Sequence, residues 1–143
     1  MEKTSVKELN TFLKGEYMAV DGYQGYIDKV EDEKIKGELE KIKQDHEKHT
    51  ERISQQIEKL GGQPIQGVGM MGKMAEMVSG VKNMTKDDTN SILEAAYHGE
   101  GQGIKMAEEV IKGDLDEKSN QMISEILDTD REHLDTLESL KNG

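Results

Sequence analysis

The sequence predicts an all-α protein, an antiparallel four-helix bundle with one long crossover between the second and third helices. Apolar residues recur at alternating spacings of three and four along four segments of roughly 25 residues, which is the period of one helix face. Only one proline, Pro64, occurs among the 143 residues. The hydrophobic fraction of 33% is too low for a sheet covered on both faces, but it suffices for helices that each bury one apolar stripe.

The first helix is expected over residues 5–31, where Ser5 and Glu8 have the spacing of a capping box. Its apolar stripe is interrupted by one acidic residue, Glu16. The second helix is expected over residues 33–60, and two histidines one turn apart interrupt its stripe. The sequence GGQP then stops this helix, because glycine favours the C-terminal cap and proline cannot continue a helix.

The crossover is expected over residues 61–85, a segment rich in glycine and methionine. A connection of this length is unusual inside a compact domain. It is expected to hold a short helix around residues 73–81. Its five methionines are Met70, Met71, Met74, Met77 and Met84. They indicate either a surface for a soft metal or a partner, or side chains that fill irregular gaps, which is the commoner use of methionine.

The third helix is expected over residues 86–112, between a capping box of Thr85 and Asp88 and a stop at Gly113. Its stripe is interrupted by a glutamate. Two short links and one long link then describe two helical hairpins, the arrangement of a bundle with one crossover.

The fourth helix is expected over residues 115–141, where Asp114 and Glu117 have capping-box spacing. An aspartate and a histidine, one turn apart, interrupt its apolar stripe. The same interruption in the second helix suggests that the two hairpins are related.

The polar interruptions of the four stripes repeat with a fixed spacing. They are Glu16, His46 and His49 in the first half of the chain, and Glu100, Asp130 and His133 in the second half. In each half the second and third residues follow the first by 30 and 33 positions, and the two halves are offset by 84 positions. Residues placed symmetrically about the turn of an antiparallel hairpin lie at the same height. All six side chains are therefore expected to meet at one level inside the bundle.

Six buried ionisable groups without partners would cost several kcal/mol each. Carboxylates and neutral imidazoles are ligands of divalent metals, and bundle cores build metal sites from side chains on facing helices. The spacing therefore predicts a metal site formed by the six residues. The alternative is a metal-free network of hydrogen bonds between acids and histidines.

Composition excludes several classes of function. The net charge of −11 argues against nucleic acid and against anionic membrane surfaces as partners. The absence of cysteine excludes disulfides and thiolate metal sites. No apolar run approaches the roughly 20 residues of a membrane span, and the N-terminal sequence MEKTSVKELN has no hydrophobic signal region. A cytoplasmic location and a homodimer, the commonest closed assembly, are expected.

The paired motifs resemble those of the ferritin-like superfamily, which has a glutamate on the first and third helices and Glu-x-x-His on the second and fourth. Glu16 and Glu100 match the single glutamates, and His49 and His133 match the two histidines. The sequences DGYQGY and HGEGQG resemble an uncharacterised bacterial family of ferritin-like domains. The resemblance covers nearly the whole chain.

Two residues depart from the family pattern. Asp130 stands where the fourth helix has glutamate, and His46 stands where the second helix has a carboxylate. Three carboxylates and three imidazoles carry less negative charge against two divalent ions than the family set does. One tight and one weak site, or a single mononuclear site, is therefore an alternative to a full dinuclear centre.

The resemblance implies iron as the metal, two ions per chain if both sites fill, with zinc or manganese as alternatives. It further implies a non-haem di-iron oxidoreductase that acts on ferrous iron with oxygen or peroxide. The competing hypothesis is a non-catalytic metal-binding, structural or interaction bundle with a mononuclear or degenerate site. The sequence leaves open whether the protein turns over a substrate.

Other polar and small residues allow two readings each. The helical glycines indicate close helix approach or room beside a site: Gly15, Gly22, Gly25, Gly99, Gly101 and Gly103. Tyr17, Tyr23 and Tyr97 lie on or beside the stripes and are either redox neighbours of a metal or packed core residues. Asp45 either supports the site or is exposed, and Glu94 with His98 forms either a surface metal pair or a solvated pair.

Overall fold

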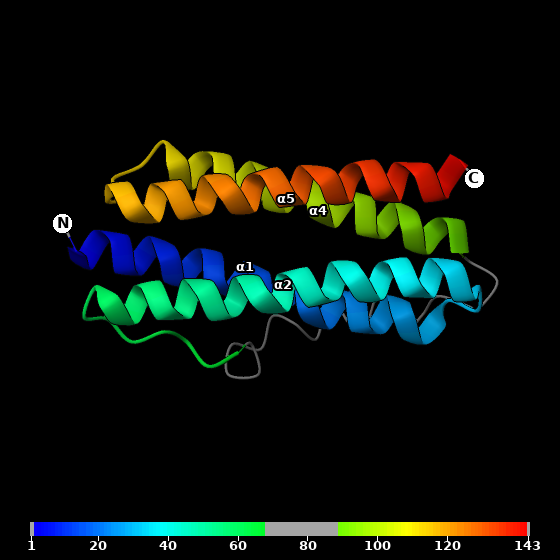
Figure 1. Ribbon diagram of the computed structural model, residues 1–143, viewed down its shortest axis with the longest axis horizontal. Coiled ribbons are helices and arrows are strands. Elements are labelled where there is room, and N and C mark those ends of the chain that lie inside the picture. Colours follow the sequence, from blue (N-terminus) through cyan, green and yellow to red (C-terminus); the bar gives the residue numbers. More distant parts are fainter. Residues whose placement is uncertain (1, 68–88, 143) are drawn as a thin grey trace.

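Four helices run antiparallel to their neighbours along the long axis of the molecule (Figure 1). The structure is a computed structural model and describes residues 2–67 and 89–142. The helices are α1 (Glu2–Lys29), α2 (Glu33–Lys59), α4 (Thr89–Ile111) and α5 (Glu117–Asn142). Each packs mainly against two others, so that α1, α2, α5 and α4 form a ring in that order. The predicted fold class is confirmed.

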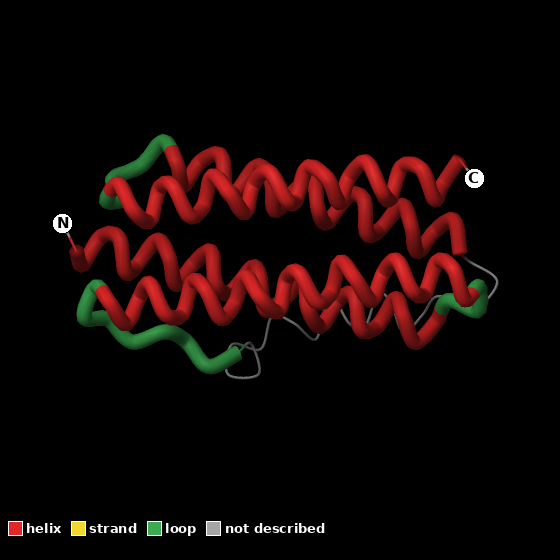
Figure 2. Tube along the Cα trace, in the orientation of Figure 1, coloured by secondary structure: helices red, strands yellow, loops and turns green. Residues whose placement is uncertain are grey.

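Short loops join α1 to α2 and α4 to α5, whereas α2 ends and α4 begins at opposite ends of the bundle (Figure 2). The connection between these two helices therefore has to span the length of the bundle, as a long crossover does. The short helix predicted around residues 73–81, the five methionines of the crossover and the capping box of Thr85 and Asp88 lie outside the described residues.

The first helix begins at Glu2, and Ser5, its predicted cap, lies inside α1. The Ser5 side chain is buried, and its hydroxyl accepts a hydrogen bond from the backbone N–H of Asp116, 3.2 Å away, at the start of α5. The capping box predicted for Ser5 and Glu8 is therefore wrong. The serine serves a helix 111 residues further along the chain, a contact that exists only in the folded bundle.

The fourth helix has a different cap from the one predicted. Asp116 precedes α5, and its Oδ2 accepts a hydrogen bond from the backbone N–H of Ser119 at 3.2 Å. The capping box predicted for Asp114 and Glu117 is therefore wrong by two positions. Asp32 caps α2 in the same manner, accepting from two backbone N–H groups of the first turn at 2.9 and 3.1 Å.

The predicted stop after the second helix is confirmed. Gly61 adopts a φ of +83°, a left-handed conformation that favours glycine. The N–H of Gly62 donates to the carbonyl of Ile57 at 2.9 Å, and the N–H of Gly61 donates to that of Glu58 at 3.0 Å. These bonds satisfy carbonyls that the end of a helix leaves without partners.

The apolar core is divided into two clusters, one toward each end of the bundle. One includes Leu9, Phe12, Leu13, Ile53, Ile57 and Ile123, and the other includes Ile27, Val30, Leu39, Ile42, Leu93 and Leu137. Buried polar residues of all four helices lie between them in sequence and in height. No helix in the described part of the chain is both long and apolar enough to cross a membrane, and the cytoplasmic location stays a prediction.

Replacing Gly101 with alanine is expected to stabilise the bundle. A Cβ at this interior position of α4 would meet no atom within 4 Å, and glycine weakens a helix interior by about 1 kcal/mol relative to alanine. We expect Gly101→Ala to raise the melting temperature by a few degrees in thermal unfolding followed by circular dichroism.

Gly62→Ala serves as the comparison variant, because a Cβ at this position would clash with the side chain of Val6 at 2.6 Å. This variant is expected to melt at a lower temperature than the wild type. An equal shift in both variants would contradict the account.

Candidate metal centre

Six ionisable side chains from four helices converge between the two apolar clusters. Glu16 comes from α1, His46 and His49 from α2, Glu100 from α4, and Asp130 and His133 from α5, and none is more than 7% exposed. The helix periods explain this, because each residue takes a position in the inward stripe of its helix. The structure thus brings together all six residues singled out in the sequence. Their role as metal ligands stays a prediction.

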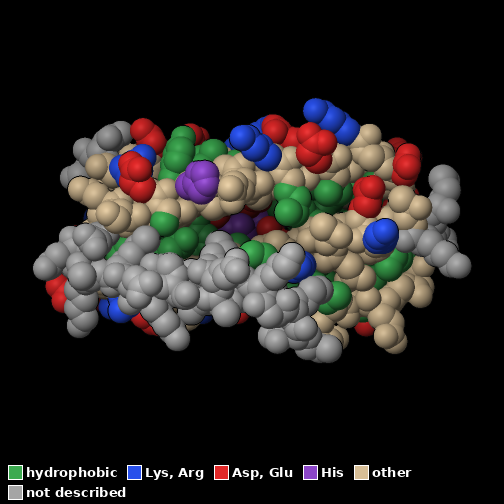
Figure 3. Space-filling model, turned by 180° about the vertical axis from the view of Figure 1, so that it is seen from behind, with side chains coloured by type: hydrophobic (Ala, Val, Ile, Leu, Met, Phe, Trp, Pro, Cys, Tyr) green, Lys and Arg blue, Asp and Glu red, His purple; other side chains and the backbone are tan. Residues whose placement is uncertain are grey.

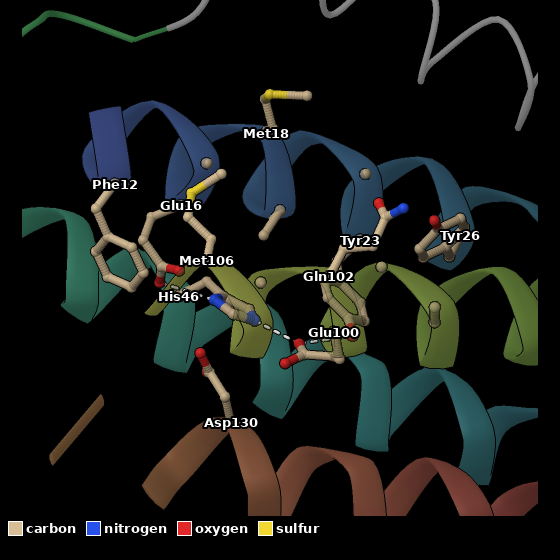
Figure 4. Close-up of a pocket in the computed structure, with 16 residues that line it drawn as sticks. Phe12, Glu16, Met18, Tyr23, Tyr26, His46, Glu100, Gln102, Met106 and Asp130 are labelled. Atoms are coloured by element: carbon tan, nitrogen blue, oxygen red, sulfur yellow. Dashed lines mark hydrogen bonds and ion pairs between the residues drawn. The ribbon is translucent and has the colours of Figure 1, made fainter. Parts of the chain in front are cut away.

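His46 links the two halves of the cluster (Figure 4). Its Nδ1 lies 2.9 Å from Oε1 of Glu16, and its Nε2 lies 2.5 Å from Oε1 of Glu100. The same Oε1 of Glu16 lies 2.8 Å from Nδ1 of His49. One imidazole therefore occupies the centre of the cluster, where the family pattern has a carboxylate, and holds a glutamate on either side.

The α5 side of the cluster is less well paired. Among the described residues, Oδ1 of Asp130 and Nδ1 of His133 are buried without any hydrogen-bond partner. The two atoms lie 3.5 Å apart, and Nδ1 of His133 lies 3.4 Å from Oε1 of Glu100. Buried polar atoms are almost always paired, so a carboxylate oxygen and an imidazole nitrogen left facing each other point to a missing partner.

The donor atoms form two overlapping groups that suit a cation. His46, Glu100, Asp130 and His133 offer ligand atoms that lie within 4.8 Å of one another, and Glu16, His46 and His49 form a second such group. Oxygen and nitrogen donors of this kind suit iron, zinc and manganese. The residues therefore fit a metal, and His46 belongs to both groups.

Electrostatics within the cluster favour charged histidines. Burial opposes the charge on His46, but the carboxylates of Glu16 and Glu100 outweigh it and hold the pKa of His46 well above its usual value. Burial likewise opposes the charge on His133, and Asp130 and Glu100 raise its pKa to about 10. Burial works against the Glu100 carboxylate, yet the charged His46 lowers the pKa of Glu100 to about 2. Without a metal, protons therefore balance the buried acids.

Asp45 orients one of the histidines. Its Oδ2 lies 2.8 Å from Nε2 of His133, while the aspartate itself is partly exposed at the surface of α2. An acid on one imidazole nitrogen fixes the tautomer and turns the other nitrogen inward. His49 has no equivalent acid, since the residue 84 positions after Asp45 is Thr129, whose hydroxyl donates to the backbone of its own helix. The internal symmetry of the sequence is broken here.

The tyrosines divide by position. The hydroxyl of Tyr23 donates to Oε1 of Glu100 at 2.8 Å, so this tyrosine contacts the cluster directly. Tyr17 packs against the apolar cluster at the N-terminal end of α1, and Tyr97 lies under the ammonium of Lys141 at 4.7 Å from its ring centre. Only Tyr23 of the three predicted candidates is therefore placed to act on a ligand.

The predicted surface pair of Glu94 and His98 lies away from the cluster. Both residues are exposed, and Glu94 forms an ion pair with Lys141 at 3.2 Å. The solvated reading of this pair fits the structure, because neither residue joins a group of close ligand atoms within the described residues.

Comparisons with known proteins place the fold. Residues 4–113 match the family described as a domain of unknown function (DUF2383), and no curated protein matches the sequence. A two-domain protein of Anabaena variabilis, with DJ-1/ThiJ/PfpI-like and ferritin-like domains, is similar over 99% of this chain at a TM-score of 0.80 and 18% identity. This chain spans only 37% of that protein.

A second solved structure is similar over most of both chains. It is a dodecameric thioferritin, the bacterioferritin-related protein of Bacteroides fragilis, with a TM-score of 0.77 and 21% identity over 97% of this chain and 84% of the other. At such identities the similarity concerns the fold alone. The fold is ferritin-like, as the spacing of the paired motifs suggested.

The stability of the metal-free protein is expected to depend on pH in a defined direction. The pKa of His133 rises from 6.5 to about 10 on folding, so its stabilisation is complete below pH 6.5 and is lost as the pH rises toward 10. The pKa of Glu100 falls from 4.5 to about 2, so its stabilisation is complete above pH 4.5 and is lost as the pH falls toward 2. Chelator-treated protein should therefore melt at the highest temperature between pH 4.5 and 6.5.

The measurement is thermal unfolding in EDTA from about pH 3 to pH 9. A plot of melting temperature against pH should fall on both the acid and the alkaline side, as the shifted pKa values require. His133→Asn is the matched variant, because it removes the histidine charge and should flatten the alkaline limb. A melting temperature that keeps rising from pH 6.5 to pH 9 in the wild type would contradict charged pairing in the cluster.

Proposed function

The chain belongs to the DUF2383 family and has the ferritin-like fold, and from the geometry of its centre we propose that it is a metal-binding protein with a non-haem di-iron oxidoreductase site, acting on ferrous iron with oxygen or peroxide. One observation carries the proposal. Oδ1 of Asp130 and Nδ1 of His133 are buried, face each other at 3.5 Å and have no hydrogen-bond partner among residues 2–67 and 89–142. A divalent cation would satisfy both atoms together with Glu100.

Two ions per chain would each draw on one of the two groups of ligand atoms. Glu100, Asp130 and His133 would hold one ion, and Glu16 with His49 would hold the other, with His46 available to either. Bound iron would supply the one-electron chemistry that the side chains themselves lack. The two similar structures agree with the ferritin-like fold from whose motifs iron was inferred, and the oxygen and nitrogen donor set suits iron by its chemistry.

The chain's own groups would prepare the site. Tyr23 donates a hydrogen bond to Oε1 of Glu100. Burial, and then the nearby charge of Glu100, raise the pKa of Tyr23 well above its usual value, so the hydroxyl stays protonated. Oδ2 of Asp45 accepts a hydrogen bond from Nε2 of the neutral His133, so that Nδ1 would be available to a cation. The apolar clusters on either side keep water away from the two ends of the layer and strengthen these interactions.

A second candidate function rests on His46. With each ring nitrogen bonded to a glutamate, a protonated His46 neutralises two buried acids without any metal. That arrangement favours a non-catalytic bundle that holds one zinc or manganese ion on the α5 side, or a purely structural one. In this case protons would occupy the Glu16 side of the cluster.

Iron titration separates the two functions. We expect the wild-type chain to bind two ferrous ions and then to consume oxygen or peroxide, because ligands for both ions are present in the cluster. Asp130→Asn and Glu16→Gln should each lower the rate at least tenfold, since loss of even an outer-shell partner costs about 10- to 100-fold in affinity or activity. The readouts are elemental analysis, anaerobic titration and oxidant consumption.

The matched control is Glu94→Gln, an equal change on α4 at an exposed residue outside the cluster. It should leave the rate unchanged. Equal rates in all four proteins would reject the oxidoreductase, and one zinc ion per chain with no peroxide consumption would establish the second candidate.

We further propose a closed homo-oligomer, with the homodimer as the smallest unit. The similar protein of Bacteroides fragilis is a dodecamer, which supports assembly beyond one chain. Light scattering on the purified protein should give at least twice the chain mass of 16.0 kDa. A mass of one chain at micromolar concentration would contradict this.

A further inference from the structure

A cavity of about 140 Å³ opens between α1 and α4 on one side of the cluster. Seen from behind the view of Figure 1, this face is hollowed, with histidine and acidic side chains at the bottom of the hollow (Figure 3). Glu16, Glu100 and Asp130 lie at its inner end, and His46 lies beside them (Figure 4). The cavity therefore leads from the surface to the candidate centre.

Away from the centre, the wall of the cavity is uncharged and, apart from the exposed Gln102, mostly apolar. Phe12, Met18, Ala19, Ala96 and Met106 line it, and no lysine or arginine of the described chain does. An anion would meet the carboxylates at the inner end without a compensating cation, and a hydrated cation would find few oxygen donors along the wall. These features select a neutral molecule with an apolar body.

Glycines keep the cavity open. Gly99 and Gly103, one turn apart on α4, line it, and a Cβ at either position would meet no atom within 4 Å. Close helix approach therefore does not account for these two residues, although glycine weakens a helix relative to alanine. Of the two interpretations of the helical glycines, room beside the site is the one that fits Gly99 and Gly103.

Two polar groups of the cavity lack partners within the described chain. Tyr26 lines the cavity, and its relative exposure is 5%. Its hydroxyl forms no hydrogen bond with the described residues and is not one of the fully buried unpaired atoms, so it is accessible to a small molecule. Burial, and then the charge of Glu100, raise the pKa of Tyr26, so the hydroxyl is a proton donor at neutral pH. The second group is the buried Oδ1 of Asp130 at the inner end.

We propose that this cavity is a binding site for a small neutral organic molecule, with an apolar body of about the size of a benzene ring and one oxygen that accepts a hydrogen bond from Tyr26. Its volume is close to that of an engineered apolar cavity of about 150 Å³ that binds benzene. Binding depends only on the cavity. Placement of the molecule beside a redox centre rests on the proposed function.

The test uses the full chain in EDTA and three fluorinated probes followed by ¹⁹F NMR: 4-fluorobenzyl alcohol, fluorobenzene and 4-fluorobenzoate. We expect the alcohol to bind about three- to tenfold more tightly than fluorobenzene, the size of effect that one hydrogen bond gives. The benzoate should bind at least tenfold more weakly than the alcohol, because its charge meets the buried acids.

Three variants locate the binding. Gly103→Leu should lower the affinity for 4-fluorobenzyl alcohol at least tenfold, because the leucine side chain fills the cavity. Gly101→Leu, the same change two residues away and outside the lining, should leave this affinity within twofold of the wild-type value. Tyr26→Phe should reduce the affinity for the alcohol to that for fluorobenzene, and the affinity for fluorobenzene itself should not change.

Binding of no probe would overturn the proposal, because the cavity would then be filled by another part of an assembled protein. Equal affinities in the Gly103→Leu and Gly101→Leu variants would also overturn it, because the probes would then bind at a surface site. Since no iron is present, these results do not depend on oxidant consumption. Probe binding without iron oxidation would reject only the proposed function, and iron oxidation without probe binding would reject only the cavity.

Discussion

The structure depends on one electrostatic constraint, the burial of six ionisable groups in a single layer between two apolar clusters. An isolated buried charge costs several kcal/mol, so the layer persists only if opposite charges balance within it. The three acids come from α1, α4 and α5, and the histidines come from α2 and α5, so the balance joins all four helices. The same layer that interrupts the apolar core therefore fixes the height at which the helices meet.

Under the proposed function, protons and cations would compete for this layer. His46 between Glu16 and Glu100 acts as a protonated bridge, and its pKa is high because those two acids outweigh burial. A metal needs the same imidazoles in their neutral form, so each ion that enters has to displace protons. Asp130 and His133, whose facing atoms form an ion pair of 3.5 Å but no hydrogen bond within the described residues, are the part of the layer that would gain most from a cation.

Much of this arrangement could be predicted from spacing, because a fixed offset of 84 residues and helical periodicity together determine which residues share a height. The contacts between distant segments could not. Ser5 looks like a cap in the sequence, yet its hydroxyl meets the backbone of Asp116 only after the hairpins pack. The bond between Tyr23 and Glu100 and the cavity beside it likewise depend on the packing of α1 on α4, which no local pattern encodes.

The two halves of the repeat are chemically unequal, and the half that includes α5 is the better suited to a cation. On the α5 side, Asp45 orients His133, and Oδ1 of Asp130 forms no hydrogen bond within the described chain, only an ion pair with His133 at 3.5 Å. On the α1 side, Oε1 of Glu16 already lies within hydrogen-bond distance of two imidazoles, so an entering ion would have to replace existing bonds. A duplicated hairpin thus supplies a symmetric frame, and single substitutions within it separate a side suited to a cation from a side that protons already satisfy.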